Sequence, residues 1–290
     1  GIMTLRRRAW RPISLQEAIA SLYRSTHGAI PEALVINVTL IALLCLVNRK
    51  ELCRRIYACD RRTRLIALLI LGAALALRLA IPHNHIMYTD EARHMLAARA
   101  LLETHDHGPY LRSMAWPFVL SLVFALFGLS NWVALYAASV VGALAVGGLF
   151  LLALEASKSR RAALLAMLFL CLLPLHIRWS ASVETNGPSL CAILFMMYVW
   201  LVFFRRPTTG LLWLSLMCLA FTVQFRPENY FYAPVFVAGC AVFQVRPREG
   251  WRAAHLAPAL ICAALAFPNL VQNMHELLFV KWIDGETGGA

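Results

Sequence analysis

Charge is scarce in this chain, and acidic charge is scarcer than basic charge. Only 14% of the 290 residues are charged, and 27 lysines and arginines stand against 15 aspartates and glutamates. A soluble domain has about a quarter of its residues charged, so this composition excludes an ordinary soluble fold. A net charge of +12 on a soluble protein could indicate nucleic acid. Here the basic residues lie between apolar runs, so they indicate membrane topology and contacts with anionic lipid head groups, and we expect no nucleic-acid partner.

Three further patterns are missing. The apolar runs do not alternate with polar residues, which excludes a membrane β-barrel. The eight cysteines do not form a disulfide framework, since most lie inside apolar runs, where cysteine behaves as a small hydrophobe. No repeat and no soluble-domain boundary is visible. The sequence therefore predicts an all-α, polytopic transmembrane helical bundle.

What the chain has instead is long apolar runs, close to the roughly 20 residues that cross a bilayer. Several are near the short limit and need a turn from their flanks. After a basic stretch that ends at Arg64, we expect about seven core spans: Leu65–Ile81, Asn131–Leu154, Ala162–Ile177, Ser189–Phe204, Gly210–Phe225, Tyr230–Val245 and Ala253–Val271.

The loops between these runs differ in charge. One set, with the stretch Arg49–Arg64, holds 15 lysines and arginines, whereas the opposite set holds seven and nearly all the remaining acids. Positive charge stays on the cytoplasmic side, so the loops 82–112, 178–188, 226–229 and 272–290 are predicted to face outside. The predicted location is a bacterial inner or plasma membrane.

Three segments at the edges of this plan have other expected roles. Residues 13–26 form an amphipathic helix on the membrane surface. The run Ala33–Val47 either spans, which places five arginines outside, or is half-buried or re-entrant. Trp116–Gly128 is too short to span and is interpreted as an interfacial helix. We therefore divide the chain into residues 1–64, a membrane module at 65–271 with an outer loop at 82–130, and an outer segment at 272–290.

Asp90 and Glu91 are adjacent acids in the long outer loop. The sequence from Tyr88 to Arg99 is typical of an amphipathic helix that begins with acidic residues. In a purely structural interpretation, Asp90 caps the helix and Glu91 interacts with its dipole. In a catalytic interpretation, a carboxylate removes the proton of an alcohol, which contributes about 10²–10⁴-fold. Both can hold together, although periodicity alone favours the structural one.

Arginines follow the same outer side of the predicted bundle. An arginine there could bind the phosphate of a lipid-linked substrate through its planar fork of donors. Snorkelling to ordinary head groups is the alternative for each one taken singly. The candidates for phosphate binding are Arg78, Arg112, Arg178 and Arg226.

Other polar groups gather in the same outer loops. Glu184 and Glu228 lie in turns and could bind a sugar hydroxyl or orient an arginine, and Tyr88 and Tyr230 could stack on a sugar ring, although turn chemistry and an aromatic belt explain them equally well. The outer histidines match no strong metal motif, so no metal or other cofactor is required, although a divalent ion stays open. These histidines are His83, His85, His94, His105 and His107.

Taken in order, these pieces resemble the polyprenyl-phosphate-dependent glycosyltransferases of the GT-C class, which include protein O-mannosyltransferases and the aminoarabinose transferases of lipid A. The resemblance covers roughly residues 65 to 275. It rests on the Asp-Glu pair that opens a helix at Tyr88–Glu103, the interfacial helix ending in Leu-Phe-Gly at Trp116–Gly128, and the outer Arg226-Pro-Glu228. The class shares a core of seven spans, which matches the count after residue 64.

The chain departs from these relatives in two places. Their interfacial helix usually starts with a Lys/His-Pro-Pro element that helps to hold the donor phosphate, and Met114-Ala-Trp-Pro117 stands there instead, so that role passes to Arg112. Relatives often continue beyond the seventh span, whereas this chain stops at Ala290. A fragment, a minimal member and a subunit completed by another chain are three open interpretations.

The resemblance implies an inverting glycosyltransferase that moves a sugar from a polyprenyl phosphate to an acceptor hydroxyl on the outer face. Asp90 is then the base and Glu91 the next candidate, and the acceptor is a glycan, lipid or protein. A transporter or lipid flippase is one alternative, although the spans lack buried acids and show no two related halves. A non-catalytic subunit of a glycosylation complex is the other.

Overall fold

The computed structural model describes residues 15–80, 89–104, 113–245 and 251–276. These parts of the chain are helical and contain no β-strand. The predicted all-α class is confirmed. The elements are α1 (Leu15–Thr26), η1 (His27–Ala29), α2 (Ile30–Val47), α3 (Arg49–Tyr57), α4 (Arg61–Leu79), α5 (Thr89–Thr104), α6 (Ala115–Phe127), α7 (Asn131–Ser157), α8 (Arg160–Leu172), α9 (Pro174–Ser180), α10 (Asn186–Arg205), α11 (Thr209–Thr222), η2 (Pro227–Phe231), α12 (Tyr232–Val242) and α13 (Trp251–His275).

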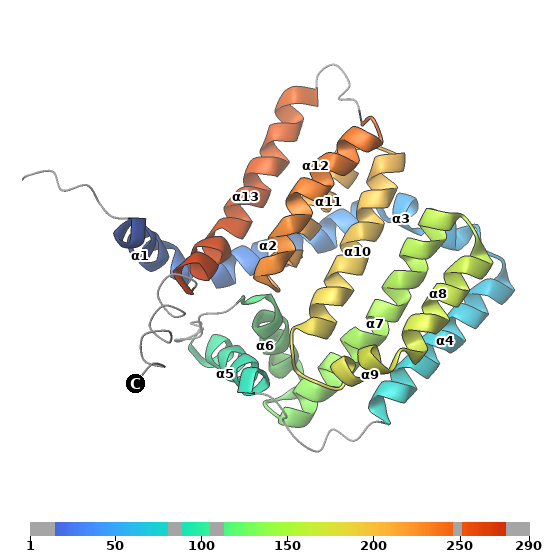
Figure 1. Ribbon diagram of the computed structural model, residues 1–290, viewed down its shortest axis with the longest axis horizontal. Helices are drawn as coiled ribbons and strands as arrows, with labels where there is room; N and C mark the ends of the chain where they lie inside the picture. Colours follow the sequence, from blue (N-terminus) through green and yellow to red (C-terminus); the bar gives the residue numbers. More distant parts are fainter. Residues whose placement is uncertain (1–14, 81–88, 105–112, 246–250, 277–290) are drawn as a thin grey trace, which may run out of the picture.

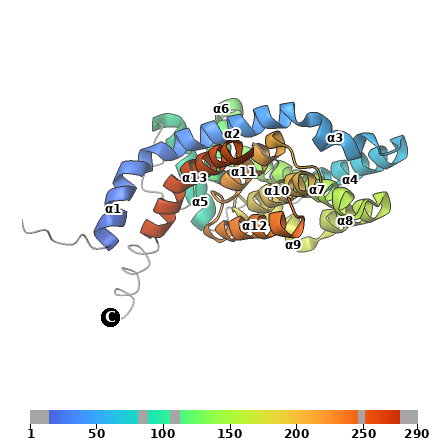
Figure 2. The ribbon, with the colours of Figure 1, turned by 90° about the horizontal axis from the view of Figure 1, so that it is seen from above.

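The helices form a bundle around the pair α7 and α10, with α4 and α8 on one flank and α11 to α13 on the other (Figure 1). Figure 2 shows α2 running along one side of this bundle, with α11 and α13 beside it. The short helices α5, α6 and α9 lie at the end opposite α3. This end holds the candidate site.

Judged by length and composition, fewer of the described helices can span a membrane than the seven predicted. The count of seven is therefore not confirmed. Four described stretches are long and apolar enough to cross a bilayer, and a fifth is counted if α8 and α9 form one span. α4 carries four arginines, while α11 and α12 are short. The segment Ala33–Val47, whose role was left open, lies inside a continuous candidate span, Glu17–Val47.

The predicted run Ala162–Ile177 is broken in the structure. α8 and α9 meet at an angle of 63° at Leu173, which has an extended backbone. Pro174 is the reason, because a proline disfavours helical geometry in the residue before it and lacks an amide hydrogen for the helix ladder. The break turns α9 across the end of α4.

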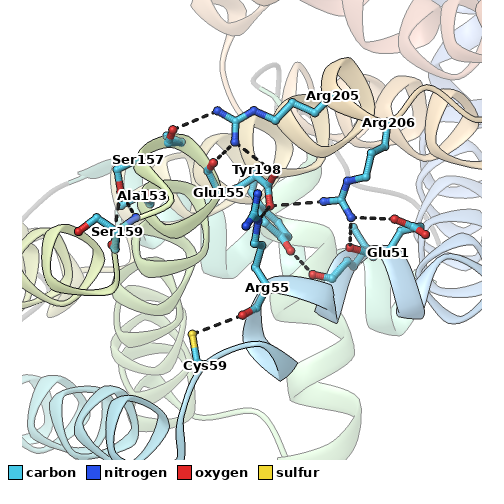
Figure 3. Close-up of polar contacts among 12 residues, drawn as sticks. Glu51, Arg55, Cys59, Ala153, Glu155, Ser157, Ser159, Tyr198, Arg205 and Arg206 are labelled. Carbon is cyan, nitrogen blue, oxygen red and sulfur yellow. Dashed lines mark hydrogen bonds and ion pairs between the residues drawn. The ribbon is translucent and has the colours of Figure 1, made fainter.

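A buried carboxylate ties three helices together at the end of the bundle that carries the basic residues (Figure 3). Glu155 in the last turn of α7 is 1% exposed. Its carboxylate oxygens lie 3.3 to 3.4 Å from the guanidinium nitrogens of Arg55 on α3, Arg205 at the end of α10, and Arg206. Arg206 also donates to Glu51 of α3 at 2.7 Å. The sequence placed Glu155 just outside a span and gave no sign that its side chain is buried.

Candidate functional site

A cavity of about 740 Å³ opens where the first turn of α5, the start of α10, η2 and the end of α13 meet. It brings together five of the residues proposed from the sequence, although they come from three separate segments. These five are Asp90, Glu184, Arg226, Glu228 and Tyr230. The cavity is wide enough for a sugar-sized ligand together with part of a second one.

Asp90 lies inside the first turn of α5, which begins at Thr89, so it is not the cap that the structural interpretation of the sequence predicted. Its side chain is 26% exposed and lines the cavity. The guanidinium of Arg93, one turn further along α5, lies 3.3 Å from Asp90 Oδ1. A carboxylate in the first turn of a helix interacts favourably with the dipole of that helix.

Glu91 is placed differently from its neighbour. It is 2% exposed, does not line the cavity, and accepts a hydrogen bond from the backbone amide of Val183 at 2.9 Å. The carbonyl of Val183 in turn accepts from the indole Nε1 of Trp116 at 2.7 Å. One residue of the turn between α9 and α10 thus joins α5 to α6. The following residues of that turn, from Glu184 to Asn186, form part of the cavity wall.

Arg226 lines the cavity just before η2. It is the one arginine or lysine among the described residues that line the cavity. Its Nη1 donates to the side-chain oxygen of Asn186, and its Nε lies 3.4 Å from Glu228 Oε2. The side chains of Arg226 and Glu228 are 41% and 67% exposed, so this ion pair is loose and can open to an anionic ligand.

Of the other three predicted arginines, the two that the structure describes do not line this cavity. Arg78 is fully buried, donates to Ser180 Oγ at 3.2 Å and lies 2.6 Å from His176 Nδ1. It therefore links α4 to α9 instead of facing the cavity. Arg178 is exposed on α9 and does not line the cavity. Arg112 lies outside the described residues, as does Tyr88.

Two smaller cavities adjoin the main one. The first, about 260 Å³, is almost entirely apolar, lies between α2, α6, α7, α10 and α11, and shares Phe225 with the main cavity. The second, about 250 Å³, lies on the α10 side of Arg226 and shares Asn186, Arg226 and Glu228 with the main cavity. Arg226 thus lies between two spaces.

The described residues contain no cluster of three or more histidine, cysteine or acidic side chains. Of the outer histidines, His94 is described; it is 3% exposed and lines the cavity beside Asp90. The remaining outer histidines, His83, His85, His105 and His107, lie outside the described residues.

Five polar residues of the wall were not singled out from the sequence. They are Ser113 before α6, Thr185 and Asn186 at the start of α10, Asn273 near the end of α13 and Glu276 just after that helix. Asn186 belongs to a Thr-Asn-Gly-Pro turn, which was a usable signal. Asn273 lay beyond the predicted end of its span, so its sequence gave no comparable signal.

A comparison with individual curated proteins finds no match. Residues 109–271, more than half of the chain, match the family described as dolichyl-phosphate-mannose-protein mannosyltransferase. The matched stretch starts after α5, so it includes Glu184, Arg226 and Glu228 and excludes Asp90. With its apolar helices, the chain belongs to the dolichyl-phosphate-mannose-protein mannosyltransferase family, a family of membrane glycosyltransferases of the GT-C type.

Proposed function

We propose that this protein is an inverting glycosyltransferase that moves a sugar from a polyprenyl phosphate to an acceptor hydroxyl on the outer face of a bacterial membrane. The observation that carries the proposal is the shared cavity of Asp90 and Arg226, with a carboxylate on one helix and a guanidinium on another. A glycosyl transfer from a phosphate needs a base for the incoming hydroxyl and a cation for the departing phosphate.

The proposed step uses these two groups in turn. The acceptor oxygen attacks the anomeric carbon while the bond from that carbon to the phosphate oxygen breaks. Asp90 takes the proton of the acceptor hydroxyl, and the phosphate leaves with the bonding electron pair. Arg226 stabilises the charge that develops on the phosphate, for which it exchanges its contact with Glu228. Attack from the side opposite the leaving group inverts the anomeric centre.

The adjoining apolar cavity supports a lipid-linked donor. It shares the lining residue Phe225 with the main cavity, and its wall offers an isoprenoid chain almost no polar group. The phosphate would then lie near Arg226, where the apolar and polar spaces meet, and Glu184, Glu228 and Tyr230 would surround the sugar or the acceptor.

The orientation follows the charge of the two ends. The basic end with Arg205 and Arg206 would face the cytoplasm, and the cavity end would face outside. No metal takes part in the proposed step, and the acceptor is a glycan, a lipid or a protein.

The experiment is Asp90→Asn in the full chain, purified in detergent and reconstituted in vesicles with polyprenyl-phosphate mannose as donor. We expect the rate of sugar transfer to fall about 10²–10⁴-fold with unchanged donor affinity. Arg226→Gln should instead weaken donor binding, because it removes a phosphate contact. The matched control is Asp60→Asn, which removes an acid at the opposite end of the bundle. Wild-type transfer by Asp90→Asn would refute the assignment of the base.

A further inference from the structure

A row of neutral amide side chains lies behind one wall of the cavity and is not used in the proposed step. Asn273 faces the cavity and donates from Nδ2 to the side-chain oxygen of Asn269, one turn earlier on α13, at 3.0 Å. Ser113, before α6, donates from its hydroxyl to Asn273 Oδ1 at 3.4 Å. Both Ser113 and Asn273 line the cavity, so this wall presents a hydroxyl and an amide side by side.

Gln224, just after α11, extends the row away from the cavity. It directly precedes Phe225 and Arg226, both of which line the cavity. Its Nε2 donates to the carbonyl of Ala220 at 2.8 Å, and its backbone carbonyl accepts from the amide of Ala115 at the start of α6.

Two atoms of this row lack a hydrogen-bond partner within the described part of the chain. They are the donor Nδ2 of Asn269 and the acceptor Oε1 of Gln224, and both residues are 0% exposed. Buried amide groups almost always have partners, so two unmatched groups in residues that directly precede the cavity-lining Leu270 and Phe225 need an explanation. One is a donor and the other is an acceptor. A hydroxyl group can bind either of them, because it accepts from a donor and donates to an acceptor.

We propose that Ser113, Asn273, Asn269 and Gln224 form the subsite that recognises the hydroxyl groups of a neutral hexose on the donor lipid. This inference rests on the proposed function and deepens it, because it assigns the sugar to the α13 wall and the phosphate to the Arg226 wall. Asn273 contacts the sugar, and Asn269 is a positioning residue that holds the Asn273 side chain. The four side chains carry no charge, which suits a neutral sugar better than an acidic one. A ligand hydroxyl that enters beside the Asn273 side chain could accept from Asn269 Nδ2, which explains the unmatched donor.

Because the proposed subsite contacts only the sugar, it should affect binding of the glycosylated lipid and not of the bare polyprenyl phosphate. The probes are polyprenyl-phosphate mannose and bare polyprenyl phosphate of the same chain length, and their dissociation constants are measured with the full chain in detergent. We expect the wild-type protein to prefer the glycosylated lipid. Asn273→Ala should reduce that preference by about five- to ten-fold, the effect of one or two neutral hydrogen bonds. Asn269→Ser should reduce it less, and Arg226→Gln should weaken both lipids equally.

A matched truncation provides the control. Asn48, between α2 and α3, is also a buried asparagine, and it donates to the carbonyl of Leu44 at 2.8 Å, far from the cavity. Asn48→Ala should leave the preference unchanged.

The results separate the two proposals. If the wild-type protein binds neither lipid, the proposed function fails. If it binds both lipids equally, or keeps its preference in Asn273→Ala and Asn269→Ser, the donor lipid stands and the sugar subsite is refuted. Asn273 is half-buried at the cavity wall, so Asn273→Ala removes little packing and is expected to fold.

Discussion

Replacing Glu155 by glutamine should destabilise the whole bundle, because one buried carboxylate balances three guanidinium groups. The substitution keeps the shape of the side chain and removes its charge. The side chains of Arg55, Arg205 and Arg206 are 38%, 25% and 19% exposed, so none of them can hydrate fully in the folded protein. Removal of one partner from a fully buried ion pair costs about 3–5 kcal/mol.

The partial exposure of the arginines reduces this cost, since each guanidinium can still contact water. We therefore expect Glu155→Gln to lower the free energy of unfolding by about 2–3 kcal/mol. For a chain of this size, that corresponds to a fall in Tm of about 3–6 °C. The assay is thermal unfolding of the purified protein in detergent, followed by intrinsic tryptophan fluorescence.

The control is Glu103→Gln, which removes the exposed pair between Glu103 and Arg99 on α5, whose side chains are 45% and 59% exposed. That change should cost only about 0.3–0.5 kcal/mol. The double variant Glu155→Gln with Arg206→Gln should recover part of the lost stability, because one uncompensated cation is removed. Equal Tm values for Glu155→Gln and Glu103→Gln would show that the carboxylate does not hold the three helices.

Three further predictions concern the site and its supports. Glu91→Gln should keep most of the transfer activity, because its oxygen can still accept from Val183; a loss as large as that of Asp90→Asn would assign the base to Glu91 instead. Gly142→Ala should lower the unfolding free energy by about 1–3 kcal/mol, since its new methyl group would lie 2.2 Å from Ser180 Oγ, whereas the control Gly147→Ala meets only Leu71 at 3.7 Å and should be neutral in the same thermal assay. The hydrogen bond from the Thr63 hydroxyl lowers the pKa of Asp60, so its contribution to stability is present above the ordinary carboxyl pKa and is lost as the pH falls through the lowered value. The difference in Tm between the wild type and Asp60→Asn should therefore shrink as the pH falls below about 4, and a constant difference would contradict the cause given.

The sequence predicted the elements that carry local signals. Acids before an apolar stretch marked the first turn of α5, and a short apolar run marked α6, because helix starts and run lengths are local properties. The charge of the loops also grouped Asp90 with Arg226 and Glu184, which the structure brings to one cavity.

What the sequence could not predict depends on helix rotation and on pairs of residues far apart in the chain. Arg78 and Arg226 looked equivalent as arginines at the ends of apolar runs, yet one is enclosed by α9 and the other lines the cavity. Glu91 is adjacent to Asp90, but successive helical residues point about 100° apart, so only Asp90 lines the cavity. The break at Pro174 had a local signal, which the continuous apolar run outweighed.

The contact through Val183 has a consequence for how this protein can change. Both hydrogen bonds that Val183 makes, to Glu91 and to Trp116, use its backbone amide and carbonyl. Almost any residue could therefore replace Val183 as far as these two bonds are concerned, whereas an altered side chain at either of its partners breaks one of them. Val183 is itself buried in the apolar core, but substitutions in the residues that follow it in the turn can change the shape of the adjacent cavity wall while α5 and α6 keep their positions. These two backbone hydrogen bonds would let the binding preferences of the site diverge while Asp90 keeps its position.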